Sequence, residues 1–178
     1  MTNIMLDLET FGLDPNAAIV AIGAVEFFPE SNTLGDEFYK NIELRSSVES
    51  GGIIDPDVVV WWMKQEKGAK DSLFVDGQHI HSVLLDFLSW IKSLGGEPII
   101  WGNGSAFDNV VLRQSYKRSS LQEPWSYKND RCYRTVRGMY PDIKPDERIG
   151  IEHNALDDAK NQALHLMKIL RTVTKTEE

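Results

Sequence analysis

Two periodicities of apolar residues run along the chain and predict strands first and helices later. Three β-branched and apolar segments come near the N-terminus, at residues 4–8, 18–28 and 37–44. Turn-forming residues at 12–16 and 30–36 separate them. These connections are too short for helical crossovers, so we expect three antiparallel strands.

Helical spacing appears after these three segments. Apolar residues recur every three or four positions over 80–94 and 154–173, which predicts two amphipathic helices. Asp55 followed by Pro56 is a typical helix start, and that helix is expected to continue to about Lys67.

Shorter elements fill the middle of the chain. Residues 98–101 are apolar and predict a buried strand, and Ser105 is expected to cap a helix that follows it. A further helix is expected between 130 and 140. Strands mixed with helices predict one α/β domain over 1–173, with a frayed tail at 174–178.

Composition narrows the class of protein. The chain has 178 residues, of which 42% are hydrophobic and 26% charged, as in soluble globular proteins. No apolar run approaches the ~20 residues that a membrane span needs, so no membrane partner is expected. A single cysteine, Cys132, fits a reducing cytoplasm. The net charge of −8 argues against a protein that coats nucleic acid by bulk electrostatics.

The charges are unevenly distributed. Residues 1–60 hold 11 acidic and two basic side chains, whereas residues 113–137 hold seven basic and two acidic ones. An acidic centre beside a basic segment suits an enzyme that binds metal and grips a short polyanion, although a solvated helix face would explain the basic segment equally well. Its basic residues are Arg113, Lys117, Arg118, Lys128, Arg131, Arg134 and Arg137.

Two carboxylates interrupt the first apolar segment, which has the sequence I-M-L-D-L-E-T-F from Ile4 to Phe11. Residues i and i+2 of a strand point to the same face, so Asp7 and Glu9 stand side by side. A divalent cation with oxygen ligands would offset their repulsion. A solvated edge strand would also accommodate the pair.

Asp108 is the second candidate, in the segment N-G-S-A-F-D-N that begins at Asn103. It follows a buried strand at the start of a helix, a common position for functional groups in α/β folds. A capping box is the alternative, with Ser105 as N-cap and Asp108 as the N3 residue that bonds back to the N-cap amide.

The third candidate group, H-N-A-L-D-D, begins at His153 immediately before the last helix. Five residues turn a helix by about 500°, so His153 and Asp158 converge only if His153 lies on the incoming loop. Asn154 as N-cap would permit this arrangement. Asp157 competes with Asp158 as the inward carboxylate, and helical periodicity does not choose between them.

In their order D-L-E-T-F-G, G-S-A-F-D-N and H-N-A-L-D-D-A, these motifs resemble those of the DEDDh 3′–5′ exonucleases. That family has the ribonuclease H-like fold and includes proofreading subunits, oligoribonuclease and ribonuclease T. The resemblance extends from about residue 4 to residue 170. Residues 54–65 are similar to a small branch of bacterial exoribonucleases and phage exonucleases.

The resemblance implies a fold, a metal site and an assembly. The fold would be α/β, with a ribonuclease H-like mixed sheet in which parallel strands extend the three antiparallel ones, flanked by helices. Many relatives dimerise, so a homodimer is also expected. The implied ligands of two Mg²⁺ or Mn²⁺ ions are Asp7, Glu9, Asp108 and Asp158.

The same resemblance implies that His153 is the general base, and the family's H-x4-D motif selects Asp158 over Asp157. The chemistry is consistent with this set of residues. Two cations about 4 Å apart activate a water and stabilise the leaving oxygen of a phosphodiester. A histidine accepts the proton of that water near neutral pH.

Residues after the first carboxylates are candidates for substrate binding. Thr10 and its backbone would contact the terminal 3′-hydroxyl, with Glu9 as the acceptor. Phe11 would stack on the last base, because aromatic stacking tolerates any base. The alternative for Phe11 is a core position after the strand.

Two further substrate contacts are expected from other segments. Trp61 and Trp62 face about 100° apart on a helix, so one is expected to pack in the core and the other to meet the substrate. We assign Trp61 as the candidate. Asn103 would shape the loop beneath Asp108.

Three functions follow as hypotheses. The first is a two-metal exonuclease that releases nucleoside 5′-monophosphates from single-stranded 3′ ends of RNA or DNA. The second is a catalytically silent module of the same fold that binds nucleic acid or a replication partner, which would not need to keep these repelling carboxylates. The third is a ribonuclease H-type endonuclease, which the His153 motif disfavours.

Overall fold

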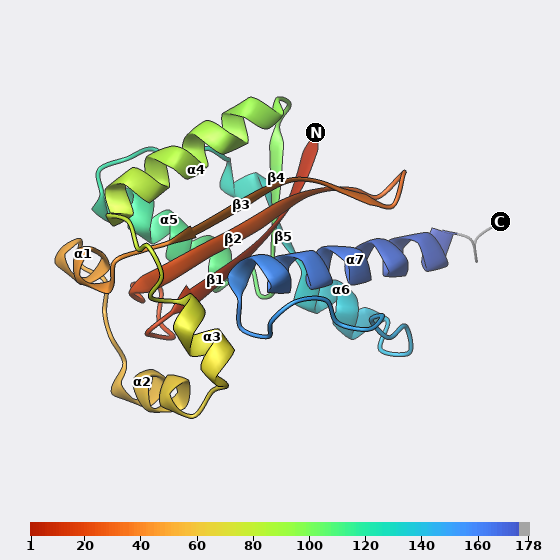
Figure 1. Cartoon of the computed structure of the whole chain (residues 1–178). Coiled ribbons are helices and arrows are strands. Elements are labelled where there is room, and N and C mark those ends of the chain that lie inside the picture. Colours follow the sequence, from red (N-terminus) through yellow and green to blue (C-terminus); the bar gives the residue numbers. More distant parts are fainter. Residues whose placement is uncertain (175–178) are drawn as a thin grey trace.

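The computed structural model describes residues 1–174, and its centre is a five-stranded mixed sheet of order β3-β2-β1-β4-β5 (Figure 1). β1 and β2 are antiparallel, as are β2 and β3, whereas β4 is parallel to both β1 and β5. This sheet confirms the predicted mixed α/β fold. The strands are β1 (Thr2–Thr10), β2 (Ile19–Phe28), β3 (Thr33–Asn41), β4 (Pro98–Gly102) and β5 (Asp130–Cys132).

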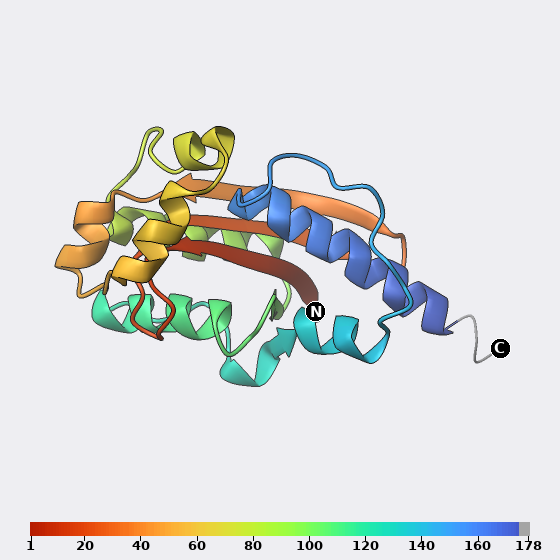
Figure 2. The same ribbon diagram turned by 90° about the horizontal axis from the view of Figure 1, so that it is seen from below.

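Helices cover both faces of the sheet, with α4 and α5 on one face and α6 and α7 on the other (Figures 1 and 2). Helices α1 to α3 lie at one end of the sheet. In residues 1–174, no helix combines the length and apolar character that crossing a membrane would require. The helices are α1 (Leu44–Glu49), α2 (Pro56–Met63), α3 (Lys67–Ser72), α4 (Ile80–Leu94), α5 (Asp108–Arg118), the 3₁₀ helix η1 (Tyr127–Asn129), α6 (Tyr133–Met139) and α7 (Ala155–Thr174).

The alternation of side chains along β1 divides the core into two layers. Ile4 and Leu6 pack in the layer beneath α4 and α5, and Met5 packs beneath α6 and α7. Asp7 and Glu9 continue the Met5 face because they lie two and four residues further along the strand. The first two candidate carboxylates therefore point to the side of the sheet that α7 covers.

A glycine allows α7 to approach the sheet next to these carboxylates. Gly23 of β2 is the cross-strand partner of Asp7. A Cβ atom at Gly23 would lie 2.1 Å from the backbone carbonyl carbon of Ala155 and 2.2 Å from the backbone nitrogen of Leu156. The first turn of α7 therefore lies directly on the sheet at this position, where any larger residue would push it away.

Several element boundaries differ from those expected. β3 begins at Thr33, inside the segment predicted as a turn, because its pairing with β2 extends to Phe28. It ends at Asn41, which pairs with Ala21. Leu44 starts α1, which the sequence pattern did not predict. The Asp55 cap is confirmed, since Asp57 N donates to Asp55 Oδ1 at 2.8 Å. That helix ends at Met63, and α3 follows separately.

The expected cap at Ser105 is wrong. Residues 103–107 form turns, and α5 begins at Asp108, so Asp108 is the first helical residue and not the N3 member of a capping box. The Ser105 hydroxyl instead hydrogen-bonds the thiol of Cys132.

The expected helix from 130 onward begins three residues later, because Asp130–Cys132 pairs with β4 as strand β5. The Asp130 carboxylate accepts hydrogen bonds from Asn109, Arg113 and Trp125, and these tertiary contacts override local helical preference. Of the predicted tail, Thr174 ends α7 and residues 175–178 lie outside the described part of the chain.

The Gly23→Ala substitution tests the close approach of α7. The added methyl group would overlap the α7 backbone, so we expect the free energy of unfolding to fall by about 1–3 kcal/mol. Urea denaturation measures this change. Gly68→Ala in α3 is the matched control, because nothing lies within 4 Å of its Cβ position and alanine favours a helix. Equal stability of the two variants would contradict the packing described.

Candidate metal centre

Three carboxylates from two distant segments converge at the start of α7. Asp7 and Glu9 come from β1, and Asp158 comes from the first turn of α7. One ligand oxygen from each lies within 4.8 Å of the others. The pairing of β1 with β2 shifts register between Glu9 and Thr10, and such a bulge re-aims side chains at the end of a strand.

Asp108 lies beside this group but outside the 4.8 Å set. Its side chain is 4% exposed, and it accepts hydrogen bonds from the backbone of Leu8 and Asn103. Its charge acts on the group, because it raises the pKa of Asp7. All four predicted carboxylates therefore belong to one electrostatic cluster.

Burial of these acids makes their ionised forms costly. Burial, followed by the charges of Asp108 and Asp158, raises the pKa of Asp7 well above its usual value. Burial and the neighbouring Asp7 raise the pKa of Glu9 to about 10. Burial raises the pKa of Asp108 to about 7, although hydrogen bonds from the backbone oppose that shift. A bound cation would reverse this cost by favouring the ionised forms.

The donor atoms fit a hard divalent cation. All are carboxylate oxygens, the ligand type that Mg²⁺ and Mn²⁺ prefer. Glu9 Oε1 is buried and has no hydrogen-bond partner among the described residues, which is the state expected of a ligand atom. Asp7 is oriented by Gln162, whose Nε2 donates to Asp7 Oδ1 at 2.8 Å.

Arg148 supplies positive charge to the cluster. Its guanidinium forms an ion pair with Asp158 and donates to Ile151 O at 3.0 Å. The preceding loop is also attached to α7, since Asn161 Nδ2 donates to Ile149 O at 2.8 Å and its Oδ1 accepts from Ile149 N at 3.0 Å. Arg148 therefore reaches the cluster from a loop that is fixed to the same helix as Asp158.

His153 lies on the loop before α7, as its convergence with Asp158 requires. Its backbone φ is +63°, a left-handed conformation that lets the chain turn sharply into the helix. His153 N donates to Asp158 Oδ2 at 3.2 Å. The imidazole is held edge-on by the rings of Trp61 and Trp62, with centroids 5.0 and 6.0 Å away.

Asp157 points away from the cluster. Its backbone amide donates to Asn154 Oδ1 at 3.2 Å, so Asn154 caps α7 as expected. Its carboxylate accepts from Ile151 N at 2.8 Å and so supports the incoming loop. The structure brings Asp158, and not Asp157, to Asp7 and Glu9.

The carboxylates open into a cleft that continues as an apolar groove. The cleft has a volume of about 530 Å³, and its lining includes Asp7, Glu9, Arg137, Arg148, His153 and Asp158. The groove has a volume of about 410 Å³, and its lining includes Leu8, Glu9, Thr10, Val58, Trp61 and Phe107. Because Glu9 lines both, the groove begins at the metal-binding group.

The four candidate substrate residues have different positions. Thr10 and Trp61 line the apolar groove, and Trp61 is 43% exposed. Trp62 is the tryptophan that packs, and its Nε1 donates to Thr10 O at 2.9 Å. Asn103 lines the acidic cleft. Phe11 is buried and lies beside the rings of Trp62 and Phe74. The structure therefore places it in the core, which was the alternative to base stacking.

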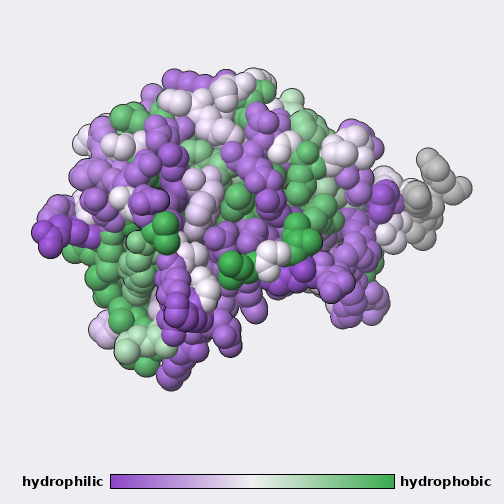
Figure 3. Space-filling view, viewed as in Figure 1, coloured by the Kyte–Doolittle hydropathy of each residue, from purple (hydrophilic) through white to green (hydrophobic). Residues whose placement is uncertain are grey.

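Exposed apolar side chains extend from the groove across the surface. Figure 3 shows hydrophobic patches at the lower left, over α2 and the segment that leads to it. Val60 and Met63 of α2, and Ile53 and Ile54 just before it, are 38–70% exposed.

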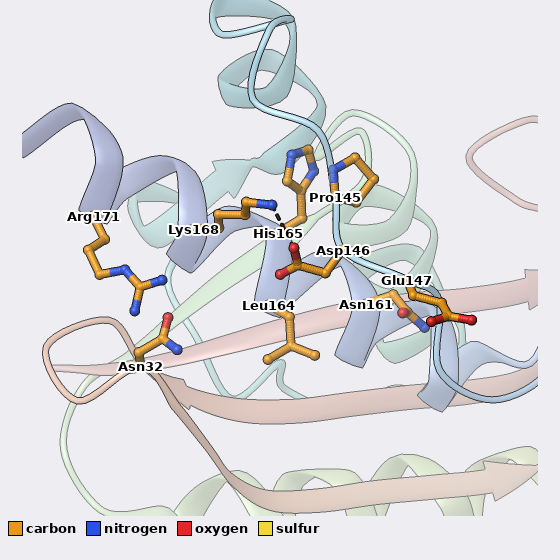
Figure 4. A pocket seen from close by; sticks show the side chains of 9 residues that line it. All are labelled: Asn32, Pro145, Asp146, Glu147, Asn161, Leu164, His165, Lys168 and Arg171. Carbon is orange, nitrogen blue, oxygen red and sulfur yellow. Dashed lines mark hydrogen bonds and ion pairs between the residues drawn. The ribbon is translucent and has the colours of Figure 1, made fainter.

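A smaller pocket of about 90 Å³ lies between α7 and loop residues 145–147, with Asn32 also in its lining (Figure 4). Lys168 of α7 donates to Asp146 Oδ1 at 2.6 Å within this pocket. His165 is also held there, since its Nε2 is 2.7 Å from Ile143 O. These contacts fasten the loop to α7, and we assign the pocket a structural role.

Two residues at the cluster were not predicted from the sequence. Gln162 lies four residues after Asp158 and therefore on the same helical face, a spacing that would have identified it. Arg148 reaches Asp158 from an irregular loop, where no periodicity indicates the direction of a side chain.

A mixed sheet with carboxylates on its central strand is the architecture of the ribonuclease H-like exonucleases, and comparison with solved structures shows this fold. The nuclease domain of 3′hExo, a DEDDh family member bound to rAMP, has a TM-score of 0.65 and 17% identity over 96% of this chain and 92% of that one. Exonuclease X in complex with 5′ overhanging duplex DNA has a TM-score of 0.62 and 19% identity over 97% and 93%.

The E. coli ExoI–ssDNA complex also matches, with a TM-score of 0.65 and 18% identity over 98% of this chain and 41% of that one. No curated protein matches the sequence. The family model of the Rv2179c-like 3′–5′ exoribonuclease domain matches residues 2–170. The chain therefore belongs to the Rv2179c-like 3′–5′ exoribonuclease family, which confirms the resemblance to DEDDh exonucleases.

Divalent ions should stabilise the protein, and more so at higher pH. Because the folded-state pKa values of Glu9 and Asp108 are raised, the unfolding free energy in chelator should fall as pH rises from about 4, up to about 7 for the Asp108 contribution and about 10 for that of Glu9. Metal binding requires the ionised forms, so its stabilisation should grow over the same range. At a hundredfold excess over Kd, we expect Tm to rise by about 5–10 °C.

Thermal melts with Mg²⁺, Mn²⁺ or chelator at several pH values measure this effect. Asp7→Asn is the control, because it removes one ligand and one repelling charge together. It should melt higher than the wild type in chelator and gain less from metal. A wild-type Tm that does not respond to either ion would refute the metal site.

Proposed function

We propose that this protein is a metal-dependent 3′–5′ exonuclease that releases nucleoside 5′-monophosphates from single-stranded 3′ ends. The observation that carries the proposal is the convergence of Asp7, Glu9 and Asp158 in the lining of an open cleft, with Glu9 buried and the other two half-buried. Buried carboxylates that repel one another destabilise a fold, so their grouping is best explained by a ligand. Family membership supports the 3′–5′ polarity.

Each residue has a role that follows from its position. Asp7, Glu9, Asp108 and Asp158 would hold two divalent ions, Mg²⁺ or Mn²⁺. When bound, the ions supply the activated water and neutralise charge on the leaving oxygen. His153 lines the same cleft and accepts the proton of that water.

The apolar groove accommodates the last nucleoside. Its apolar and aromatic lining suits a base that is bound without sequence discrimination, with Trp61 as the exposed stacking surface. Glu9 and Thr10 lie where the groove meets the cleft, in position to bind the 3′-hydroxyl. Asn103 lines the acidic cleft, and its Oδ1 has no partner among the described residues, so a small rotation of the side chain would let it contact substrate.

We propose RNA as the preferred substrate. The family description names an exoribonuclease, whereas Exonuclease X and ExoI among the structural neighbours were solved with DNA. A protein distinguishes the two through the 2′-hydroxyl, which is both a donor and an acceptor. The expected homodimer and the expected cytoplasmic location stay predictions.

A matched digest tests the activity and the substrate together. RNA and DNA oligomers of one sequence, labelled at the 5′ end, are incubated with Mg²⁺ or Mn²⁺. We expect a ladder that shortens from the 3′ end, faster on RNA, and mononucleotides with a 5′-phosphate as product. Internal cuts would indicate an endonuclease, and intact oligomers with both ions would refute the proposed activity.

Substitution of single residues tests the assigned roles. Asp7→Asn and Asp158→Asn should lose several orders of magnitude in rate, because each removes a metal ligand. His153→Ala should lose about 10²–10⁴-fold, the usual contribution of a general base.

Asp157→Asn is the matched control for Asp158→Asn. It changes the neighbouring aspartate, whose carboxylate faces the loop, and should keep most of the activity. An equal loss in the two variants would mean that proximity to the cluster does not identify the ligand.

A further inference from the structure

The structure separates the basic segment 113–137 into paired and unpaired residues. Arg113 forms ion pairs with Glu123 and Asp130, at 3.1 and 2.9 Å. Arg131 donates to the backbone oxygens of Lys128 and Asp130. Arginines that are satisfied in this way hold the fold together and contribute little to ligand binding.

Arg137 is different because it lines the acidic cleft without an ion pair to any residue of 1–174. Its guanidinium lies 5.5 Å from the ring centroid of Tyr133. That ring is fixed in turn, since the Tyr133 hydroxyl is 2.7 Å from His165 Nδ1. Arg137 is exposed, and its contact with Tyr133 orients the guanidinium while most of its N–H donors remain available.

Arg134 lies one helical turn before Arg137 and so on the same side of α6. Its guanidinium rests against Gly104. The Arg134 Cζ atom lies 3.3 Å from the position that a Cβ atom at Gly104 would occupy. Gly104 has a φ of +123°, which also favours glycine at this position. Arg134 forms no ion pair within the described residues, and its charge lowers the pKa of Asp108.

The positions of the two cavities indicate the direction in which a nucleic-acid strand would lie. The lining of the apolar groove contains no lysine or arginine, which suits a terminal nucleoside with no further phosphate. Phosphates on the 5′ side of the scissile bond must leave the metal centre by the cleft. Two other charges there are already paired, because Arg148 contacts Asp158 and Asp146 binds Lys168.

We propose that α6 binds the strand on the 5′ side of the scissile bond, with Arg137 and Arg134 contacting successive phosphates. The Cβ atoms of residues i and i+3 are about 5–6 Å apart on a helix, comparable with the spacing of neighbouring phosphates. The proposal rests on the exonuclease function, and it gives the cleft a polarity: nucleoside in the apolar groove, upstream backbone along α6.

Neutral methylphosphonate linkages test the contact at single phosphates. The substrate is a 5′-labelled oligomer with one such linkage, placed first or second on the 5′ side of the scissile bond. For wild-type protein we expect either substitution to lower kcat/KM by about tenfold, the usual loss for one charge-assisted hydrogen bond. On the natural oligomer, Arg137→Ala should have a kcat/KM about tenfold below that of the wild type. Neutralising the phosphate that Arg137 contacts should then cause no further loss in this variant.

Arg131→Ala is the matched control, because it removes a basic residue of the same segment whose guanidinium is already bonded to the backbone oxygens of Lys128 and Asp130. This variant should have the kcat/KM of the wild type on every oligomer. A neutral linkage placed only at the 5′ end of the oligomer should not change kcat/KM for the wild type or for either variant. Full sensitivity of Arg137→Ala to both internal neutral linkages would overturn the proposal. If the wild type does not shorten the natural oligomer with either ion, the exonuclease function itself fails and the proposal falls with it.

Discussion

The backbone contact between α7 and the sheet at Gly23 is the constraint on which the rest of the site depends. It places the first turn of the last helix against the strand that pairs with Asp7, so that Asp158 reaches Glu9 and Asp7, which lie 149 and 151 positions earlier in the chain. Further along the same helix, Ala159, Ala163 and Leu166 pack against the sheet in the core. The same helix therefore both builds the core and positions the carboxylate, and the site is as rigid as the core.

This rigidity holds together a group of charges that would otherwise separate. Within the described chain, Asp158 is offset by the Arg148 guanidinium and Asp7 by a hydrogen bond from Gln162, and both groups approach from α7 or the loop attached to it. These groups do not offset the full cost of the negative charges, so burial and mutual repulsion raise the pKa values of Asp7 and Glu9, and burial raises that of Asp108. Functional sites commonly concentrate such perturbed groups, at a cost that the surrounding packing must exceed.

Strongly periodic segments made the architecture predictable from sequence. The helix Ile80–Leu94 has the boundaries that its apolar spacing indicated, and the alternation in β1 correctly placed Asp7 and Glu9 on one face. Features set by tertiary contacts were not predictable. β5 exists because Asp130 binds three partners from other segments, and Arg148 reaches the cluster through a loop without any repeat. The choice of Asp158 came from the motif, since helical periodicity allowed either aspartate.

The coupling of core and carboxylate within α7 has an evolutionary consequence. One inserted or deleted residue between Ala155 and Gln162 would rotate everything after it by about 100° and separate the cluster from the apolar face. The exposed connection before the helix tolerates changes in length more readily, because only its attachment points to α7 are constrained. Among descendants of this chain, length variation should therefore accumulate ahead of the histidine, while the spacing from histidine to glutamine stays constant.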